Sequence, residues 1–175
     1  MSIWWSLDLR REAASVPLAR RFLLGAMETA GVDPDISFDL SIALTEACAN
    51  AVEHGGEQRA RGEQGAGQDP WDARGEPSGA ACGQYRVTAY LDGETCRIEV
   101  TDSGPGFPAR RIPRRSAHQP DPLPYPSLGA ENGRGLCLIE ELADHVHFGN
   151  RPGHGAVVSF DKVLKWRKGA LLMVS

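Results

Sequence analysis

The sequence predicts an α+β sandwich, with helices on one face of a mainly antiparallel sheet. Three observations support this fold class. Helical periodicity recurs in three segments, a hairpin turn signal separates two short strand-like runs, and the elements follow in the order strand, two helices, hairpin, helix, hairpin. The length of 175 residues fits one domain with a substantial core. We therefore expect a single domain over residues 1–175.

Composition and charge narrow the class of protein. The hydrophobic fraction is 41%, the charged fraction 24% and the formal net charge −4, which predicts a globular protein without direct binding to nucleic acid or a membrane. The start of the chain is too short in apolar run for a secretory signal, and no stretch approaches the roughly 20 apolar residues that cross a bilayer. We expect a cytoplasmic location. Reduced thiols without a CxxC pair are expected at Cys48, Cys82, Cys96 and Cys137.

The N-terminal part predicts a strand followed by a helix. Loose alternation over residues 3–9 is typical of an edge strand. Ser15 offers an N-cap for a helix over residues 16–30, and Gly31 is a suitable C-terminal stop. The apolar side chains at helical spacing in this segment are Leu18, Phe22, Leu23 and Ala26.

A second helix is predicted to open at Asp33-Pro34 and to run to about His54, where Gly55-Gly56 closes it. Its apolar residues recur at about 100° per residue and form one continuous face. We therefore expect this helix to pack on the core through Ile36, Leu40, Ala43, Leu44, Ala47 and Ala51.

Two polar residues of this second helix are candidates for chemistry. Glu46 and Asn50 are four residues apart, so they stack at the border of the apolar face. A half-buried carboxylate and amide in this position can hold a metal ion and orient a nucleophile. The alternative is a solvated polar flank that forms a weak helical pair, and the helix alone does not decide between the two.

The middle of the chain predicts an insertion and a hairpin. Residues 55–83 are rich in glycine, glutamine, arginine and proline, which predicts a flexible surface insertion. Strands are expected over residues 85–91 and 95–100, and Asp92-Gly93 is the hairpin turn between them.

A second candidate site directly follows this hairpin. Asp102 is placed at the end of a strand, where its carboxylate can accept a hydrogen bond from an amine. Gly104 and Gly106 permit a tight turn and close approach of the backbone to a ligand. The alternative is a simple turn, because aspartate, serine, glycine and proline are all common turn residues.

The C-terminal part predicts a lid, a helix and two strands. Six prolines within residues 108–132 exclude a long helix, and a connection of this length is a functional lid or a disordered segment. A helix is expected over residues 135–146, and short strands near 145–149 and 155–161 complete the sheet. Residues 164–175 are too ambiguous to assign.

The third candidate site leads into that last helix. A glycine-containing loop before a helix presents free N–H groups and the positive end of the helix dipole, which suits phosphate. The alternative is a helix start with flexible glycines. No Walker pattern and no strand–GxGxxG–helix unit occurs. The residues of this loop are Gly133, Arg134, Gly135 and Leu136.

Together and in this order, the three motifs resemble those of the GHKL ATPase superfamily, which includes gyrase-type, Hsp90-type, histidine-kinase and mismatch-repair ATP-binding domains. The resemblance spans about residues 7–160 and implies a Bergerat-type two-layer α/β sandwich over a mainly antiparallel mixed sheet. Within the superfamily, the chain is most similar to anti-sigma-factor serine/threonine kinases of the SpoIIAB/RsbW type. The matched positions are Glu46 and Asn50 in the N-box, Asp102, Gly104 and Gly106 in the first glycine box, and Gly133, Gly135 and Leu136 in the second.

The resemblance implies ATP and Mg²⁺ as ligands and assigns a role to each motif. The general base toward the attacking hydroxyl would be Glu46, and the Mg²⁺ ligand would be Asn50. Asp102 would bind the adenine amino group in a pocket shaped by Gly104 and Gly106. Arg134 and the backbone of residues 133–136, which includes Gly133, Gly135 and Leu136, would meet the phosphates.

The resemblance also implies partners. The protein would phosphorylate a STAS-type anti-anti-sigma protein, sequester a sigma factor and form homodimers. One departure is Ala156, which stands where the family usually has a nucleotide-contacting threonine. A catalytically silent, nucleotide-dependent regulator therefore remains the alternative. A histidine-kinase or gyrase-like enzyme would need further segments that these residues do not provide.

Overall fold

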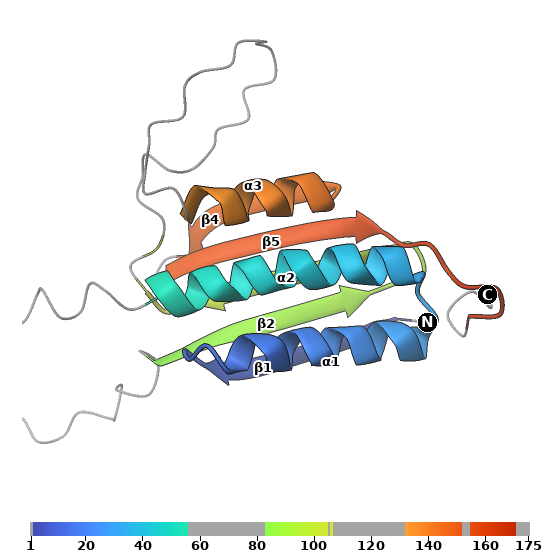
Figure 1. Cartoon of the computed structure of the whole chain (residues 1–175), viewed down its shortest axis with the longest axis horizontal. Helices are drawn as coiled ribbons and strands as arrows, with labels where there is room; N and C mark the ends of the chain where they lie inside the picture. Colours follow the sequence, from blue (N-terminus) through green and yellow to red (C-terminus); the bar gives the residue numbers. More distant parts are fainter. Residues whose placement is uncertain (1, 56–82, 105, 107–131, 152–154, 171–175) are drawn as a thin grey trace, which may run out of the picture.

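The computed structural model describes residues 2–55, 83–104, 106, 132–151 and 155–170. Most of the expected insertion at 55–83 and of the expected lid at 108–132 lies outside these ranges. The elements are arranged along the chain as drawn in Figure 1. They are β1 (Ile3–Arg10), α1 (Ser15–Ala30), α2 (Pro34–His54), β2 (Gln84–Leu91), β3 (Thr95–Asp102), α3 (Asn132–Leu142), β4 (His145–Arg151) and β5 (Gly155–Val163).

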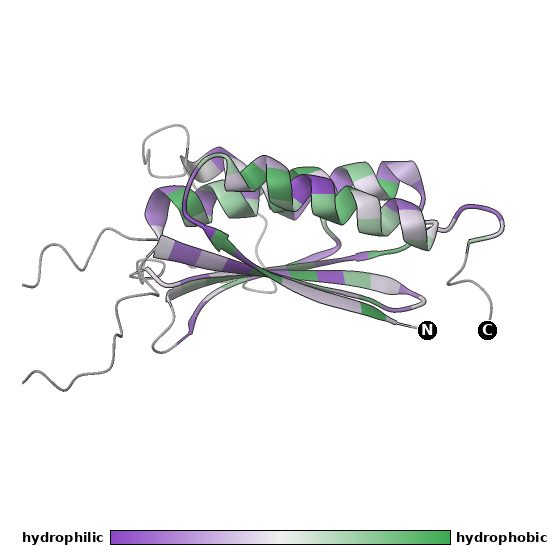
Figure 2. Cartoon of the chain, turned by 90° about the horizontal axis from the view of Figure 1, so that it is seen from below, coloured by the Kyte–Doolittle hydropathy of each residue, from purple (hydrophilic) through white to green (hydrophobic). Residues whose placement is uncertain are grey.

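The strands form one five-stranded sheet in the order β1-β2-β3-β5-β4. Every pairing among the described strands is antiparallel. All three helices lie on the same face of this sheet, as the side view in Figure 2 shows. The predicted α+β, Bergerat-type two-layer sandwich is confirmed. No helix in the described ranges is long and apolar enough to cross a membrane.

Helix α2 forms where the sequence predicts it, because its start signals are local. The Asp33 side chain accepts the N–H of Asp35 at 2.9 Å, and Pro34 occupies the first turn. Gly55 forms the C-terminal cap. The predicted apolar face is confirmed, since all six of its residues are buried against the sheet and the neighbouring helices: Ile36, Leu40, Ala43, Leu44, Ala47 and Ala51.

Helix α1 differs from its prediction at the cap. Ser15 is the first helical residue and not the N-cap, which is Ala14 and makes no side-chain capping bond. The Ser15 hydroxyl instead donates to the Glu12 carbonyl at 2.7 Å and lies 2.8 Å from the Tyr85 hydroxyl. A buried tyrosine needs a polar partner, so tertiary contact decides the role of this serine.

The buried stripe of α1 shares only Leu23 with the apolar residues that the sequence predicts at helical spacing. Leu18 and Phe22 are each 45% exposed. The physical reason is the position of α1 over β1, which is the last strand at its edge of the sheet. Phe22 only reaches the side of Trp5, with ring centroids 4.9 Å apart. The buried residues of the helix are Ser15, Ala19, Leu23, Met27 and Ala30.

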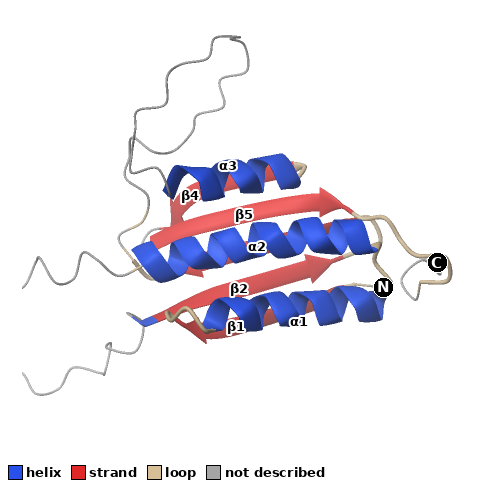
Figure 3. Cartoon of the chain, in the orientation of Figure 1, coloured by secondary structure: helices blue, strands red, loops and turns tan. Residues whose placement is uncertain are grey.

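The C-terminal elements are found in the predicted order with shifted ends. Helix α3 covers 132–142 where 135–146 was predicted, because β4 already begins at His145. The unassigned tail packs in part on the connection between α1 and α2. The Arg167 N–H donates to the carbonyl of Gly31 at 2.8 Å, and Asp33 donates to Lys165 at 2.8 Å. Figure 3 shows this loop beyond the end of β5.

Candidate functional site

The predicted site residues come from four segments that meet at one end of the sandwich. In Figure 1 the C-terminal end of α2, the end of β3, the first turn of α3 and the start of β5 all lie on the left. Glu46 and Asn50 are on α2, and Asp102 is the last residue of β3. The structure therefore brings the three sequence motifs to the same side of the molecule.

Asp102 is held by the protein through one of its two carboxylate oxygens. Oδ1 accepts the backbone N–H of Gly104 at 2.8 Å and that of Ala156 at 3.1 Å. The side chain is nearly buried, with the residue 8% exposed. Both bonds end on Oδ1, and no donor from the described residues is found on Oδ2. This second oxygen is thus left to accept a hydrogen bond from a ligand.

Burial and charge act on Asp102 in opposite directions. Removal from water raises the pKa of this carboxyl group above its ordinary value, and this is the largest effect. The two backbone N–H donors and the nearby charges of Arg11 and His54 lower the pKa in part. The protein therefore holds a buried hydrogen-bond acceptor in this site. The backbone N–H donors and the nearby positive charges offset part of the free-energy cost of removing its carboxylate from water.

Glycines surround Asp102 because no side chain fits there. Gly155 has φ 102°, and a Cβ at this position would lie 2.5 Å from the Gly104 carbonyl oxygen and 2.6 Å from Oδ1 of Asp102. A Cβ on Gly104 would lie 2.6 Å from Cα of Gly55. The end of α2, the β3 turn and the start of β5 are therefore in direct backbone contact.

Gly106 has a different neighbour. Its φ is 81°, and a Cβ there would lie 2.5 Å from Oδ1 of Asn150, which is on β4. The turn after β3 thus runs toward β4 at this point. Gly104, by contrast, lies against Gly55 at the end of α2. The two glycines of the first glycine box therefore contact different elements.

Glu46 and Asn50 point toward the start of α3. A Cβ on Gly135 would lie 2.7 Å from Oε2 of Glu46 and 3.8 Å from Nδ2 of Asn50. Both side chains are half-buried. The Asn50 Nδ2 atom is buried and has no hydrogen-bond partner among the described residues. A solvated polar flank is therefore not what these two residues form.

The residues at this end fit a magnesium ion and phosphate groups. A buried amide without a protein partner favours an external ligand, and its oxygen and nitrogen ends are interchangeable by rotation. Amide and carboxylate oxygens suit Mg²⁺. The first turn of α3 supplies N–H groups without helical partners, at Gly133 and Arg134. The Leu136 side chain packs against the core, so only its backbone can face this site.

Sequence reasoning missed three contributors to the site. Arg11 donates to the last turn of α2, and the backbone N–H of Ala156 holds Asp102. Gly155 provides the close approach described above. Ala156 was noted only for its lack of a hydroxyl, and a backbone donor has no side-chain signal. Arg11 follows an edge strand and a second arginine, so no pattern distinguishes it.

This fold and this set of motifs define an ATP-binding domain. The chain belongs to the family of histidine kinase-like ATPase domains, whose model matches residues 9–162. The GHKL resemblance is confirmed by this match, and the family membership implies that the domain binds ATP.

A solved structure shows a similar fold. It contains the RsbU and RsbW domains of Rv1364c from Mycobacterium tuberculosis and is 16% identical to this chain, with a TM-score of 0.57. The match covers 93% of this chain and 33% of the other, so this chain spans about a third of that protein's length. At this level of identity the likeness concerns the fold. A comparison with curated proteins finds no match.

Proposed function

We propose that the protein is an ATP-dependent serine/threonine kinase and anti-sigma factor, which phosphorylates a STAS-type anti-anti-sigma protein and sequesters a sigma factor. The observation that carries this proposal is that Glu46 and Asn50 lie beside Gly135 at the start of α3, where an added Cβ would come within 2.7 Å of Oε2 of Glu46 and 3.8 Å of Nδ2 of Asn50. A carboxylate, an amide without a partner among the described residues and the N–H groups of the first turn of α3 therefore lie near one another. Such a set can neutralise and orient a triphosphate beside a base.

Each candidate residue has a distinct role in the proposed reaction. Oδ2 of Asp102 accepts a hydrogen bond from the adenine amino group. The first turn of α3, together with Arg134, binds the phosphates. Bound Mg²⁺, held by Asn50, would supply positive charge to the phosphate oxygens. The partner's hydroxyl oxygen attacks the γ-phosphorus, the bond to the β-phosphate oxygen breaks, and ADP leaves. Glu46 takes the hydroxyl proton.

The proposed partners rest on the resemblance to SpoIIAB/RsbW-type kinases. The similar fold in a protein that contains an RsbW domain supports them. Anti-sigma activity would place the protein in the cytoplasm, where it would regulate transcription as a homodimer. The same model of action involves no direct contact with nucleic acid or a membrane.

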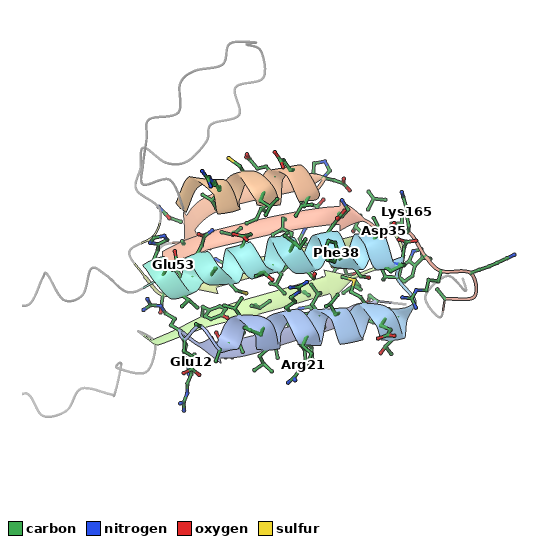
Figure 4. All side chains as sticks on the ribbon, viewed as in Figure 1. Glu12, Arg21, Asp35, Phe38, Glu53 and Lys165 are labelled. Atoms are coloured by element: carbon green, nitrogen blue, oxygen red, sulfur yellow. The ribbon has the colours of Figure 1, made fainter. Side chains whose placement is uncertain are left out.

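Substitution of the proposed base tests the kinase assignment. We expect Glu46→Ala to lower transfer of labelled γ-phosphate to a STAS-type protein by at least about 100-fold, because general-base catalysis contributes this much or more. ADP binding, measured by calorimetry, should change little. The matched control is Glu53→Ala, since Glu53 is an exposed glutamate on the same helix (Figure 4). Transfer at the parental rate by Glu46→Ala would show that Glu46 is not the base.

The second candidate is a regulator without turnover, and Ala156 is the observation that favours it. Its methyl side chain lacks the hydroxyl that the family's threonine offers to the nucleotide. A regulator of this kind would capture its partner differently with ATP and with ADP but would transfer no phosphate. Pull-down of a STAS-type protein with each nucleotide, together with the transfer assay, separates the two functions.

A further inference from the structure

We propose that Arg11 is a positioning residue of the nucleotide site, which holds the C-terminal end of α2 against the Asp102 turn. The inference rests on the proposed nucleotide binding at Asp102 and names a residue outside the three sequence motifs. Arg11 directly follows β1, so it reaches the site from the far edge of the sheet.

The guanidinium group of Arg11 binds the last turn of α2. Its Nε donates to the Ala51 carbonyl at 3.2 Å, and its Nη2 donates to the Val52 carbonyl at 3.0 Å. The Ala51 carbonyl also accepts the N–H of Gly55 at 3.1 Å, and the carbonyl groups of this last turn form the negative end of the helix dipole. The Arg11 side chain is half-buried and carries its donors in a fixed plane. It can therefore donate to both carbonyl groups and also bring positive charge to the negative end of the dipole.

A chain of close contacts links this guanidinium to Asp102. A Cβ on Gly55 would lie 2.9 Å from Nε of Arg11, and a Cβ on Gly104 would lie 2.6 Å from Cα of Gly55. Gly104 in turn donates its N–H to Oδ1 of Asp102. The four residues therefore form one stack from the arginine to the carboxylate.

Electrostatics explains why this position needs a cation. The negative end of the α2 dipole and the Asp102 carboxylate converge here, and each disfavours the other. The positive charges that face the carboxylate are those of Arg11 and of His54 when the latter is protonated, and both lower the pKa of Asp102 against the effect of burial. Without Arg11 the carboxylate should be protonated at higher pH, and α2 should be less firmly fixed.

The test compares ADP affinity at about pH 5.5 and pH 8 in the full-length protein, by calorimetry. We expect Arg11→Met to weaken ADP binding about threefold at pH 8 and about tenfold at pH 5.5, because removal of the cation raises the pKa of Asp102 and so increases the protonated fraction at the lower pH. Arg11→Lys keeps the charge but not the planar donors, and should restore the parental pH dependence. The matched control is the neighbouring Arg10→Met, which is exposed and should bind as the parent does.

Several outcomes would overturn the inference. Parental affinity at both pH values in Arg11→Met would do so, and so would an equal loss at both values that Arg11→Lys does not restore. If Arg11→Met does not fold, the pH profile of Arg11→Lys must still match the parent's. Failure of the parent itself to bind ADP would instead reject the proposed function. The two failures are therefore distinguishable.

Discussion

The two ends of the site are built in different ways. We call the part around Asp102, proposed to hold adenine, the base end, and the part around Glu46, Asn50 and the start of α3 the phosphate end. At the base end, Oδ1 of Asp102 already accepts hydrogen bonds from two backbone N–H groups, and glycines allow the backbones of three elements to pack closely. At the phosphate end, Nδ2 of Asn50 is buried without a partner among the described residues. At the base end the protein thus satisfies one carboxylate oxygen and fits the backbones closely together, whereas at the phosphate end the buried amide has no such partner and is left, in our proposal, to the ligand. This difference predicts that the base end tolerates changes of shape poorly and gains little from added groups.

The largest effect is expected from a change of shape at the base end. Gly155→Ala would force a side chain into the left-handed region at φ 102° and place its Cβ against the Gly104 backbone. Strain and overpacking together should lower the free energy of unfolding by about 3 kcal/mol. ADP binding should be lost as well. Urea denaturation and an ADP titration measure the two effects.

A glycine without close neighbours provides the control for this change. Gly25 lies in α1 and an added Cβ there meets no atom within 4 Å, so Gly25→Ala should be neutral or slightly stabilising. If Gly155→Ala were as stable as this control and still bound ADP, the base end would not be the rigid half of the site.

A change of charge without a change of shape should have the next largest effect. Asp102→Asn keeps an oxygen for the N–H groups of Gly104 and Ala156 but turns an amide N–H donor toward the adenine amino group, which is itself a donor. A hydrogen bond to a charged group contributes about 1.5–3 kcal/mol, so ADP affinity should fall by about 10- to 100-fold. ADP titration by calorimetry measures this loss. An unchanged affinity would show that Oδ2 does not face the base.

The same variant should remove a pH dependence from the free protein. Because burial raises the pKa of Asp102 in the folded state, protonation favours folding. The stability from this group is therefore present below the unfolded pKa and is lost as pH rises through the folded value. Asp102→Asn should lack this loss, which urea denaturation of the nucleotide-free protein across the acid range would measure. A parental slope in the variant would assign the effect to other carboxylates.

The predictability of the two ends from sequence also differs, for a physical reason. Glu46 and Asn50 lie one turn apart on a helix whose caps and apolar face are local patterns, so their common direction follows from helical periodicity. The base end depends on contacts between distant segments. Asp102 and Ala156 are 54 residues apart, and the bond between them uses a backbone N–H that any residue but proline carries.

The fold and its packing show the same difference between local patterns, which the sequence predicts, and contacts between distant segments, which it does not. The order of elements and the face of α2 are local features, and the sequence predicts them. The exposed side of α1 is decided by the end of the sheet at β1, which no pattern within the helix reveals. Arg11 acts on carbonyl groups 40 and 41 residues away and was missed for the same reason.

The smallest effect is expected from an added group at the base end. Ala156→Thr would supply the hydroxyl that the family usually has, while its N–H should still bind Asp102. One neutral hydrogen bond contributes about 1 kcal/mol, so ADP should bind about fivefold more tightly. Ala156→Val is the matched control, because it has nearly the same shape without the hydroxyl. If both variants bind alike, packing explains the change. If threonine instead improves affinity 100-fold, the base end was incomplete, and the contrast with the phosphate end would no longer hold.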